Sequence, residues 1–180
     1  MSTAVTLALP SVGASRDTWG TTVNAALNQL NAYIVGAWKT GTEAVTSSTT
    51  LQNDDNLVCS VVASGVYVAQ WGLRMDGAAA GDFKYAFTGP AGATMTWESR
   101  GLAAADASNL AAITTDVAAI GTTVTHGCLG AGTTTRVAGS GLLVVSSTAG
   151  SLQLQWAQGT SSGTATNVFA GSWLKLERVG

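Results

Sequence analysis

The chain has 180 residues, only 10% of them charged, and a formal net charge of −2. This length fits one medium-sized domain with an appendage, and average soluble domains carry about 25% charged residues. No cluster of Lys and Arg is present, which argues against nucleic acid as a partner. No apolar run reaches the roughly 18 residues of a membrane span, so no membrane insertion is expected.

A turn followed by a short helix is predicted at the N-terminus. Pro10 and Gly13 mark the turn. Apolar residues then recur at spacings of four, three and four, the 3.5-residue seam of a coiled coil. The seam comprises Val23, Leu27, Leu30 and Ile34, and Trp19 extends it by one turn. Because so short a helix is marginally stable alone, we expect it to pack on its own β-domain or, as we favour, on copies of itself or a larger assembly.

The rest of the chain divides into a linker and one β-domain. We expect residues 1–38 to form a docking turn and oligomerisation helix, residues 39–50 a Thr/Ser-rich linker, and residues 51–180 the β-domain. The low charge of the chain suggests that other subunits cover much of its surface.

Strands are predicted after residue 50, because the hydrophobic period changes there to two. In "SLQLQWAQ", Leu152, Leu154 and Trp156 alternate with Ser151, Gln153 and Gln155. Further strands are predicted at "NLVCSVV", "VYVAQWGLRM", "FKYAF", "TMTWE", "GLLVVSS" and "SWLKLERV". Seven or eight such strands separated by Gly/Asp/Asn/Ser turns predict an antiparallel β-sandwich or jelly roll. Residues 102–125 break the alternation, and we expect a partly helical excursion there.

The tryptophans divide into two groups according to strand phase. Trp71, Trp97 and Trp156 lie on the apolar phase of three strands, so we expect them in the core. Trp173 lies on the polar phase of the last strand, opposite to Leu174 and Leu176. We expect Trp173 at an interface or as a surface aromatic for sugar stacking.

The sequence offers few candidates for chemistry. His126 is the single histidine and is expected in a turn, because no Ser-His-Asp set can be assembled around it with any specificity. Cys59 and Cys128 are expected as two buried thiols, with one disulfide as the alternative. Four aspartates are expected in or near turns: Asp54, Asp55, Asp76 and Asp82. We therefore expect no catalytic residue, no metal and no cofactor.

Two segments of the chain carry a resemblance. The N-terminal residues that carry it are Leu9, Pro10, Gly13, Trp19, Gly20 and Asn24. This segment resembles the start of tail-fibre and appendage proteins of tailed bacteriophages, which have a Leu-Pro-x-x-Gly turn, a Trp-Gly and a short Asn-containing helix. The C-terminal stretch "GSLQLQWAQGTSSGTATNVFAGSWLKLERV" is similar to β-domains in virion proteins of actinobacterial phages. The strand pattern is also similar to that of trimeric C1q/TNF-type jelly rolls, by analogy alone.

The resemblance implies a non-enzymatic structural protein of the virion, made in the host cytoplasm. It implies a short homotrimeric fibre or decoration protein on the head or tail, docked through its N-terminal segment and displaying its β-domain. The implied partners are copies of itself, other virion proteins and a host-surface glycan. The alternatives are a free, lectin-like carbohydrate-binding module with Trp173 as its stacking platform, and a glycan-cleaving enzyme, which the small number of acidic residues disfavours.

Overall fold

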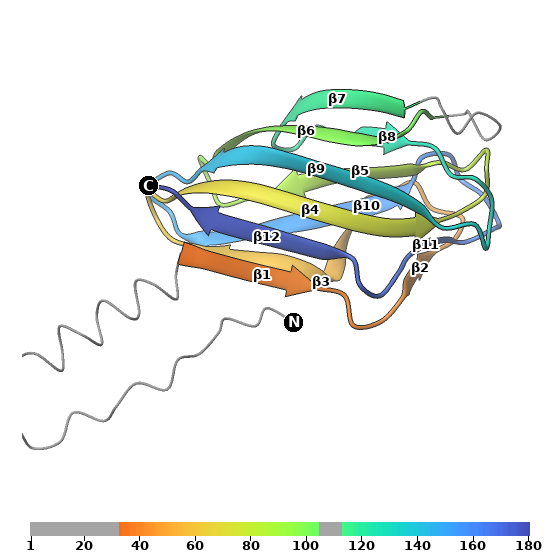
Figure 1. The fold of residues 1–180 in the computed structure, drawn as a ribbon, viewed down its shortest axis with the longest axis horizontal. Coiled ribbons are helices and arrows are strands. Elements are labelled where there is room, and N and C mark those ends of the chain that lie inside the picture. The colour runs from red at the N-terminus through yellow and green to blue at the C-terminus, as the bar shows by residue number, and fades with distance from the viewer. Residues whose placement is uncertain (1–32, 105–112) are drawn as a thin grey trace, which may run out of the picture.

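The computed structural model describes residues 33–104 and 113–180 and has a mainly β fold. Two sheets lie face to face, and every strand pairing among the described residues is antiparallel (Figure 1). The prediction of an antiparallel β-sandwich is therefore confirmed. We call the two layers the large sheet and the small sheet.

The large sheet has eight described strands and the small sheet has four. In the large sheet the order is β1-β12-β4-β9-β6-β7, with β11 beside β4 and β2 beside β11. Its strands are β1 (Ile34–Trp38), β2 (Glu43–Val45), β4 (Val66–Asp76), β6 (Thr94–Leu102), β7 (Ile113–Ala119), β9 (Thr135–Val144), β11 (Thr166–Val168) and β12 (Trp173–Arg178). In the small sheet the order is β3-β10-β5-β8, with β3 (Gln52–Val61), β5 (Phe83–Thr88), β8 (Val124–His126) and β10 (Gly150–Gln158).

The chain alternates between the two sheets along most of its length. It passes from β3 in the small sheet to β4 in the large one, then to β5, and later through β8, β9 and β10 in the same alternation. The β6–β7 hairpin interrupts this alternation and adds two strands beyond β9 at the edge of the large sheet. The sheets are thus wound together, and neither could form its buried face alone.

Aromatic rings fill the space between the sheets. Trp71, Trp97 and Trp156 are each at most 1% exposed. Trp71 meets Trp97 edge to face with ring centroids 5.6 Å apart, and it meets Phe87 at 4.7 Å. Such edge-to-face pairs stabilise a core beyond their buried area by about 0.5–1.5 kcal/mol each. The tryptophans predicted to be internal therefore lie at the centre of the sandwich.

The predicted N-terminal helix is not supported at Ile34, the seam residue that the structure describes, although Tyr33 directly before it has a helical backbone. Ile34 begins strand β1 and pairs with Glu177 of β12. The heptad pattern predicted Ile34 in the helical seam. However, Ile34 and Val35 are β-branched and Gly36 is a poor helix former, so these residues favour a strand paired with β12. The other predicted docking and seam residues lie outside the described residues: Leu9, Pro10, Gly13, Trp19, Val23, Leu27 and Leu30.

Two segment boundaries also differ from the prediction. The sandwich starts at Ile34 rather than at residue 51, and the stretch expected as a linker contains β2. Within residues 102–125, the expected partly helical excursion instead contains β7, paired along its whole length with β6, and β8. In both places Ala, Thr and Gly weaken the alternation of apolar and polar residues that identifies a strand. Hydrogen bonding to a neighbouring strand therefore determines the structure there.

Candidate functional site

The outer face of the large sheet, which points away from the small sheet, is the candidate functional surface. Strand register places side chains from β1, β12, β4, β9 and β6 in rows across it. We call the end where β1 begins and the C-terminus lies the proximal end, and the opposite end the distal end (Figure 1). The two ends differ in chemistry.

The proximal end carries a cluster of exposed aliphatic side chains, which we call the proximal patch. It consists of Ile34, Val68, Leu142, Val144 and Val179, which are 36–56% exposed. Val68 pairs with Leu142 across β4 and β9, and Val66 pairs with Val144 in the next outward row. In the row of Val68 and Leu142, Glu177 lies between Ile34 and Val68. Isolated exposed aliphatic residues are ordinary, but neighbouring ones such as Val68, Leu142 and Val144 mark an interaction surface.

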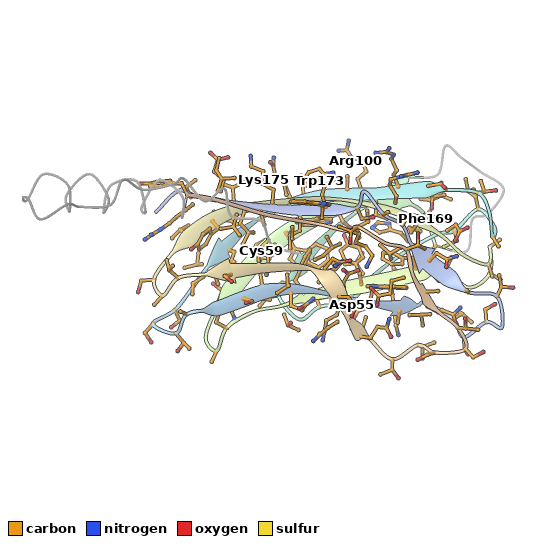
Figure 2. The ribbon with its side chains drawn as sticks, turned by 90° about the horizontal axis from the view of Figure 1, so that it is seen from below. Asp55, Cys59, Arg100, Phe169, Trp173 and Lys175 are labelled. Atoms are coloured by element: carbon orange, nitrogen blue, oxygen red, sulfur yellow. The ribbon has the colours of Figure 1, made fainter. Side chains whose placement is uncertain are left out.

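Two tryptophans occupy the middle of the same face. Trp38 and Trp173 lie opposite each other in β1 and β12, and each is about two-fifths exposed. The indole of Trp173 lies over Gly72, where an added Cβ would come within 2.7 Å of its Nε1. Figure 2 shows Trp173, Lys175 and Arg100 on the same outer side of the sandwich. Trp173 therefore depends on a glycine beneath it for its position.

The outer face of the small sheet has a different composition. Glutamine, serine, threonine and lysine side chains dominate it: Ser60, Lys84, Thr88, Thr125, Ser151, Gln153 and Gln155. Gln153 donates to the backbone oxygens of Asp54 and Leu154, and Gln155 donates to Asn53. This face is thus mainly polar and partly hydrogen-bonded within itself, with Val58 and the exposed Val62, directly after β3, as aliphatic exceptions.

The distal end of the large sheet carries arginines beside a hollow. Arg74 and Arg136 lie directly opposite each other in β4 and β9, and Arg100 projects from β6 beside Ala138. The hollow has a volume of about 390 Å³. Its lining among the described residues is Arg100, Gly101, Leu102, Leu129, Thr134, Thr135, Arg136 and Ala138.

A buried ion cluster joins the two sheets under β1. Lys39, only 2% exposed, places its Nζ 2.7 Å from Asp54 Oδ2 and 2.7 Å from Glu43 Oε2. Trp156 Nε1 also donates to Asp54 Oδ2. No sequence pattern indicated that this lysine is internal, because Lys is almost never fully buried unless it is paired.

Asp54 is expected in or near a turn, and the structure places it at an irregular point of a strand. It belongs to β3, where its Oδ1 accepts the backbone N–H groups of Asn56 and Leu57. These local bonds are the chemistry of an Asx turn, placed here at the register shift between β3 and β10. Asp55 also lies in β3, and neither aspartate is paired with β10, because both fall within this register shift.

His126 also differs from its prediction as a turn residue. It lies in β8 and is fully buried, with Nε2 2.7 Å from Ser99 Oγ and Nδ1 3.3 Å from the Leu102 carbonyl oxygen. Ser99 is only 1% exposed. The pair therefore lies inside the sandwich, where it ties β8 to β6 across the gap between the sheets.

The two cysteines are free and buried. Burial raises the pKa of each thiol from 9.0 to about 12. Cys59 Sγ lies 3.8 Å from the Leu174 carbonyl oxygen, and Cys128 Sγ lies 3.6 Å from Met75 Sδ. Since the thiolate is the reactive form, both side chains act here as core residues.

The described part of the chain has neither a cluster of metal-ligand side chains nor a membrane-spanning helix. Residues 33–104 and 113–180 contain no group of three or more His, Cys, Asp or Glu side chains that could hold a metal ion. They also contain no helix long and apolar enough to cross a membrane.

The fold defines the chain as a two-sheet antiparallel β-sandwich protein. Comparison with known protein families gives no match, and comparison with curated proteins gives none either. Among solved structures, the chain is similar to one from "the tripod (BppUct-A-L) from the baseplate of bacteriophage Tuc2009", with 14% sequence identity. The likeness covers 97% of this chain and 100% of that one, with a TM-score of 0.32. A TM-score this low carries no argument about function.

Proposed function

We propose that the protein is a non-enzymatic structural subunit of a tailed-phage virion. It assembles as a homotrimer, docks on the head or tail through residues preceding the sandwich, and displays the β-domain. The observation that carries the assembly role is the proximal patch, an exposed apolar cluster at the end where the chain enters the sandwich. The phage setting is supported by the resemblance of Leu9–Asn24 to appendage proteins.

The position of the patch favours copies of the same chain as its occupant. Ile34 belongs to the patch and directly follows residues 1–32 and Tyr33, so subunits that meet here bring their N-terminal segments together. The heptad seam predicted at Val23, Leu27 and Leu30 needs such a meeting if the helix packs on copies of itself, as we favour. Each subunit also brings charges of both signs close to the contact, including the exposed Lys175–Glu177 pair. Assembly through this end removes apolar surface from water, and it does not bring charges of only one sign together at the contact.

The strand order supports the finer assignment of the β-domain as a jelly roll. Without the β6–β7 hairpin, the series β1, β3, β4, β5, β8, β9, β10 and β12 changes sheet at every step except from β5 to β8, which both lie in the small sheet. They form two four-stranded layers, β1-β12-β4-β9 and β3-β10-β5-β8, the double-sheet arrangement of a jelly roll. On this assignment the β6–β7 hairpin is an insertion between β5 and β8 that widens the large sheet.

The burial of His126 and Ser99 supports a non-enzymatic role. A serine hydroxyl 2.7 Å from an imidazole could begin a nucleophilic site. Here the side chains are sealed between the sheets, where a substrate would have to displace the core to reach them. The contact is therefore better explained as a hydrogen bond that satisfies two buried polar groups.

Light scattering on the purified full chain tests the assembly. A trimer has three times the 18.1 kDa mass of one chain. Val68→Lys with Leu142→Lys should dissociate it, because both side chains belong to the proximal patch. The control is Val58→Lys, a valine on the outer face of the small sheet, which should leave the mass unchanged. A wild-type mass of one chain, or equal dissociation by the control, would contradict the proposal.

Virion binding tests the docking role. A chain lacking residues 1–32 retains every described strand, so it should fold as the same sandwich. We expect it not to attach to particles that the full chain decorates. Attachment at normal occupancy would place docking on the β-domain and refute this part of the proposal.

A lectin-like module is the second candidate, favoured by the exposed pair Trp38 and Trp173. Indole faces are common platforms for the C–H faces of sugars. For this candidate the full chain would be a monomer, and glycan-array binding would disappear in Trp173→Ala. A trimer whose array pattern is unchanged by this substitution would exclude it.

A further inference from the structure

We infer that the distal hollow of the large sheet is a binding site for a carboxylated sugar, of which a hexuronic acid unit is the simplest case. This inference rests on the proposed function in one respect only, because the subunit contacts must leave the distal end uncovered. The proximal patch lies at the opposite end of the sheet, so trimer formation there leaves the hollow open.

The first observation is an arrangement of like charges that the sheet itself does not require. Arg74 and Arg136 are directly opposed in adjacent strands, and like charges in this position destabilise a sheet. The ion pairs among the described residues involve only Lys39 and Lys175 as cations, so none of these arginines forms a salt bridge there; Glu98 lies two residues from Arg100 on the same face of β6. The Nη1 atom of the Arg74 guanidinium donates to the Ala170 carbonyl oxygen, whereas Arg100 and Arg136 both line the hollow.

The second observation is the shape and lining of the hollow. Its volume of about 390 Å³ lies within the range of small-molecule sites, about 300–1,000 Å³. Leu102, Leu129 and Ala138 supply apolar wall, while Thr134 adds a hydroxyl. Two arginines and an apolar wall thus border one space, the combination in which a few polar groups orient a ligand and the walls hold its body.

The third observation is that the loop forming one wall is held in place. Asp76 Oδ2 accepts the backbone N–H of Gly132, and its Oδ1 accepts the amide of Asn167. Gly130 and Gly132 have φ values of +114° and +83°, which favour glycine. Asp76 thereby fixes the loop between Leu129 and Thr134, and a preformed wall reduces the entropy lost when a ligand binds.

The lining distinguishes among anions. A guanidinium presents a planar fork of N–H donors that matches a carboxylate. A bare inorganic anion would use the arginines and leave the leucine and alanine walls in water. A sugar ring has an apolar C–H face for those walls and hydroxyls for Thr134. A carboxylate borne on a sugar ring therefore uses the whole hollow.

Titration of the full chain with glucuronate, followed by calorimetry or NMR, tests the site. Glucose, acetate and inorganic phosphate serve as comparison ligands. We expect glucuronate to bind at least about tenfold more tightly than any of the three, since each lacks either the charge or the ring. Arg100→Gln and Arg136→Gln should each weaken glucuronate binding about tenfold by removing a charge-assisted hydrogen bond.

The matched control is Arg178→Gln, an arginine at the proximal end whose Nε donates to the Gly180 carbonyl oxygen. It should bind glucuronate as the wild type does. Equal binding of glucose and glucuronate, equal binding of phosphate, or an equal loss in Arg178→Gln would each overturn the inference. Light scattering on the same samples separates the two proposals. Glucuronate binding that is lost in Arg100→Gln supports the site whether the wild-type mass is that of a trimer or of one chain.

Discussion

Lys39→Met should be among the most destabilising single substitutions in the sandwich. Lys39 and Asp54 have side chains that are 1% and 0% exposed, and their charged atoms lie 2.7 Å apart. Methionine keeps most of the side-chain volume but removes the charge. Asp54 then retains hydrogen bonds from Trp156, Asn56 and Leu57 but has no counter-charge. Leaving one partner of a buried pair uncompensated costs about 3–5 kcal/mol.

Thermal unfolding at fixed protein concentration measures this cost. One kcal/mol lowers Tm by about 2–4 °C in a domain of this size, so a fall of about 6–20 °C is expected. The control is Lys175→Met, because the Lys175–Glu177 pair is exposed and such pairs contribute about 0–1 kcal/mol. Adding Asp54→Asn to Lys39→Met should recover part of the lost Tm, because it removes the carboxylate charge that Lys39→Met leaves unpaired. The reasoning fails if Lys39→Met costs no more than Lys175→Met, or if the second substitution adds its full separate cost.

Three further predictions concern the core and the outer face. Trp156→Ala should lower the unfolding free energy by about 3–5 kcal/mol, and an unchanged urea midpoint would contradict its place in the core. Folding raises the pKa of Cys59 and Cys128 from 9.0 to about 12, so the folded state holds more protons in that window. The unfolding free energy should therefore be unaffected below pH 9 and fall between pH 9 and 12, with a smaller fall in Cys59→Ala, Cys128→Ala. Gly72→Ala should displace the Trp173 indole and raise its quenching by acrylamide, and in a Trp173→Phe background it should leave quenching unchanged.

The sheets could be predicted because their strands alternate cleanly. In β10, Leu152, Leu154 and Trp156 are at most 1% exposed, whereas Ser151, Gln153 and Gln155 face outward. A period of two is a property of the strand alone, so it can be read without knowing its neighbours. The same reasoning gave the inward phases of β4 and β6.

The misassigned positions share a dependence on neighbours far away in sequence. Ile34 is in a strand because β12 lies beside it, more than 130 residues later. Lys39 is internal because Asp54 is, and His126 is internal because Ser99 and Leu102 receive it. A polar residue is buried only where a partner is available, and no local pattern reports that partner.

The candidate sites depend on register in the same way. The proximal patch gathers residues from β1, β4, β9 and the segment after β12, and the arginines of the distal end come from β4, β6 and β9. Each residue is an ordinary exposed side chain in its own strand. They become a patch or a charge cluster only when three or four strands are aligned, so the sequence alone could not identify them.

Pairs of tryptophan and glycine fix that alignment. Trp71 lies opposite Gly139 in the β4–β9 ladder, and Trp97 lies opposite Gly141 in the β6–β9 ladder. An added Cβ at Gly139 would come within 2.3 Å of the Trp71 ring, so the indole fills the space that glycine leaves. Because inward side chains recur every second residue, β9 can slip only in steps of two without turning its core face outward. A slip in one direction puts Leu143 opposite Trp97, and a slip in the other puts Val137 opposite Trp71. Only the observed register offers both indoles a glycine, and this register also brings Val68 beside Leu142 at one end and Arg74 beside Arg136 at the other.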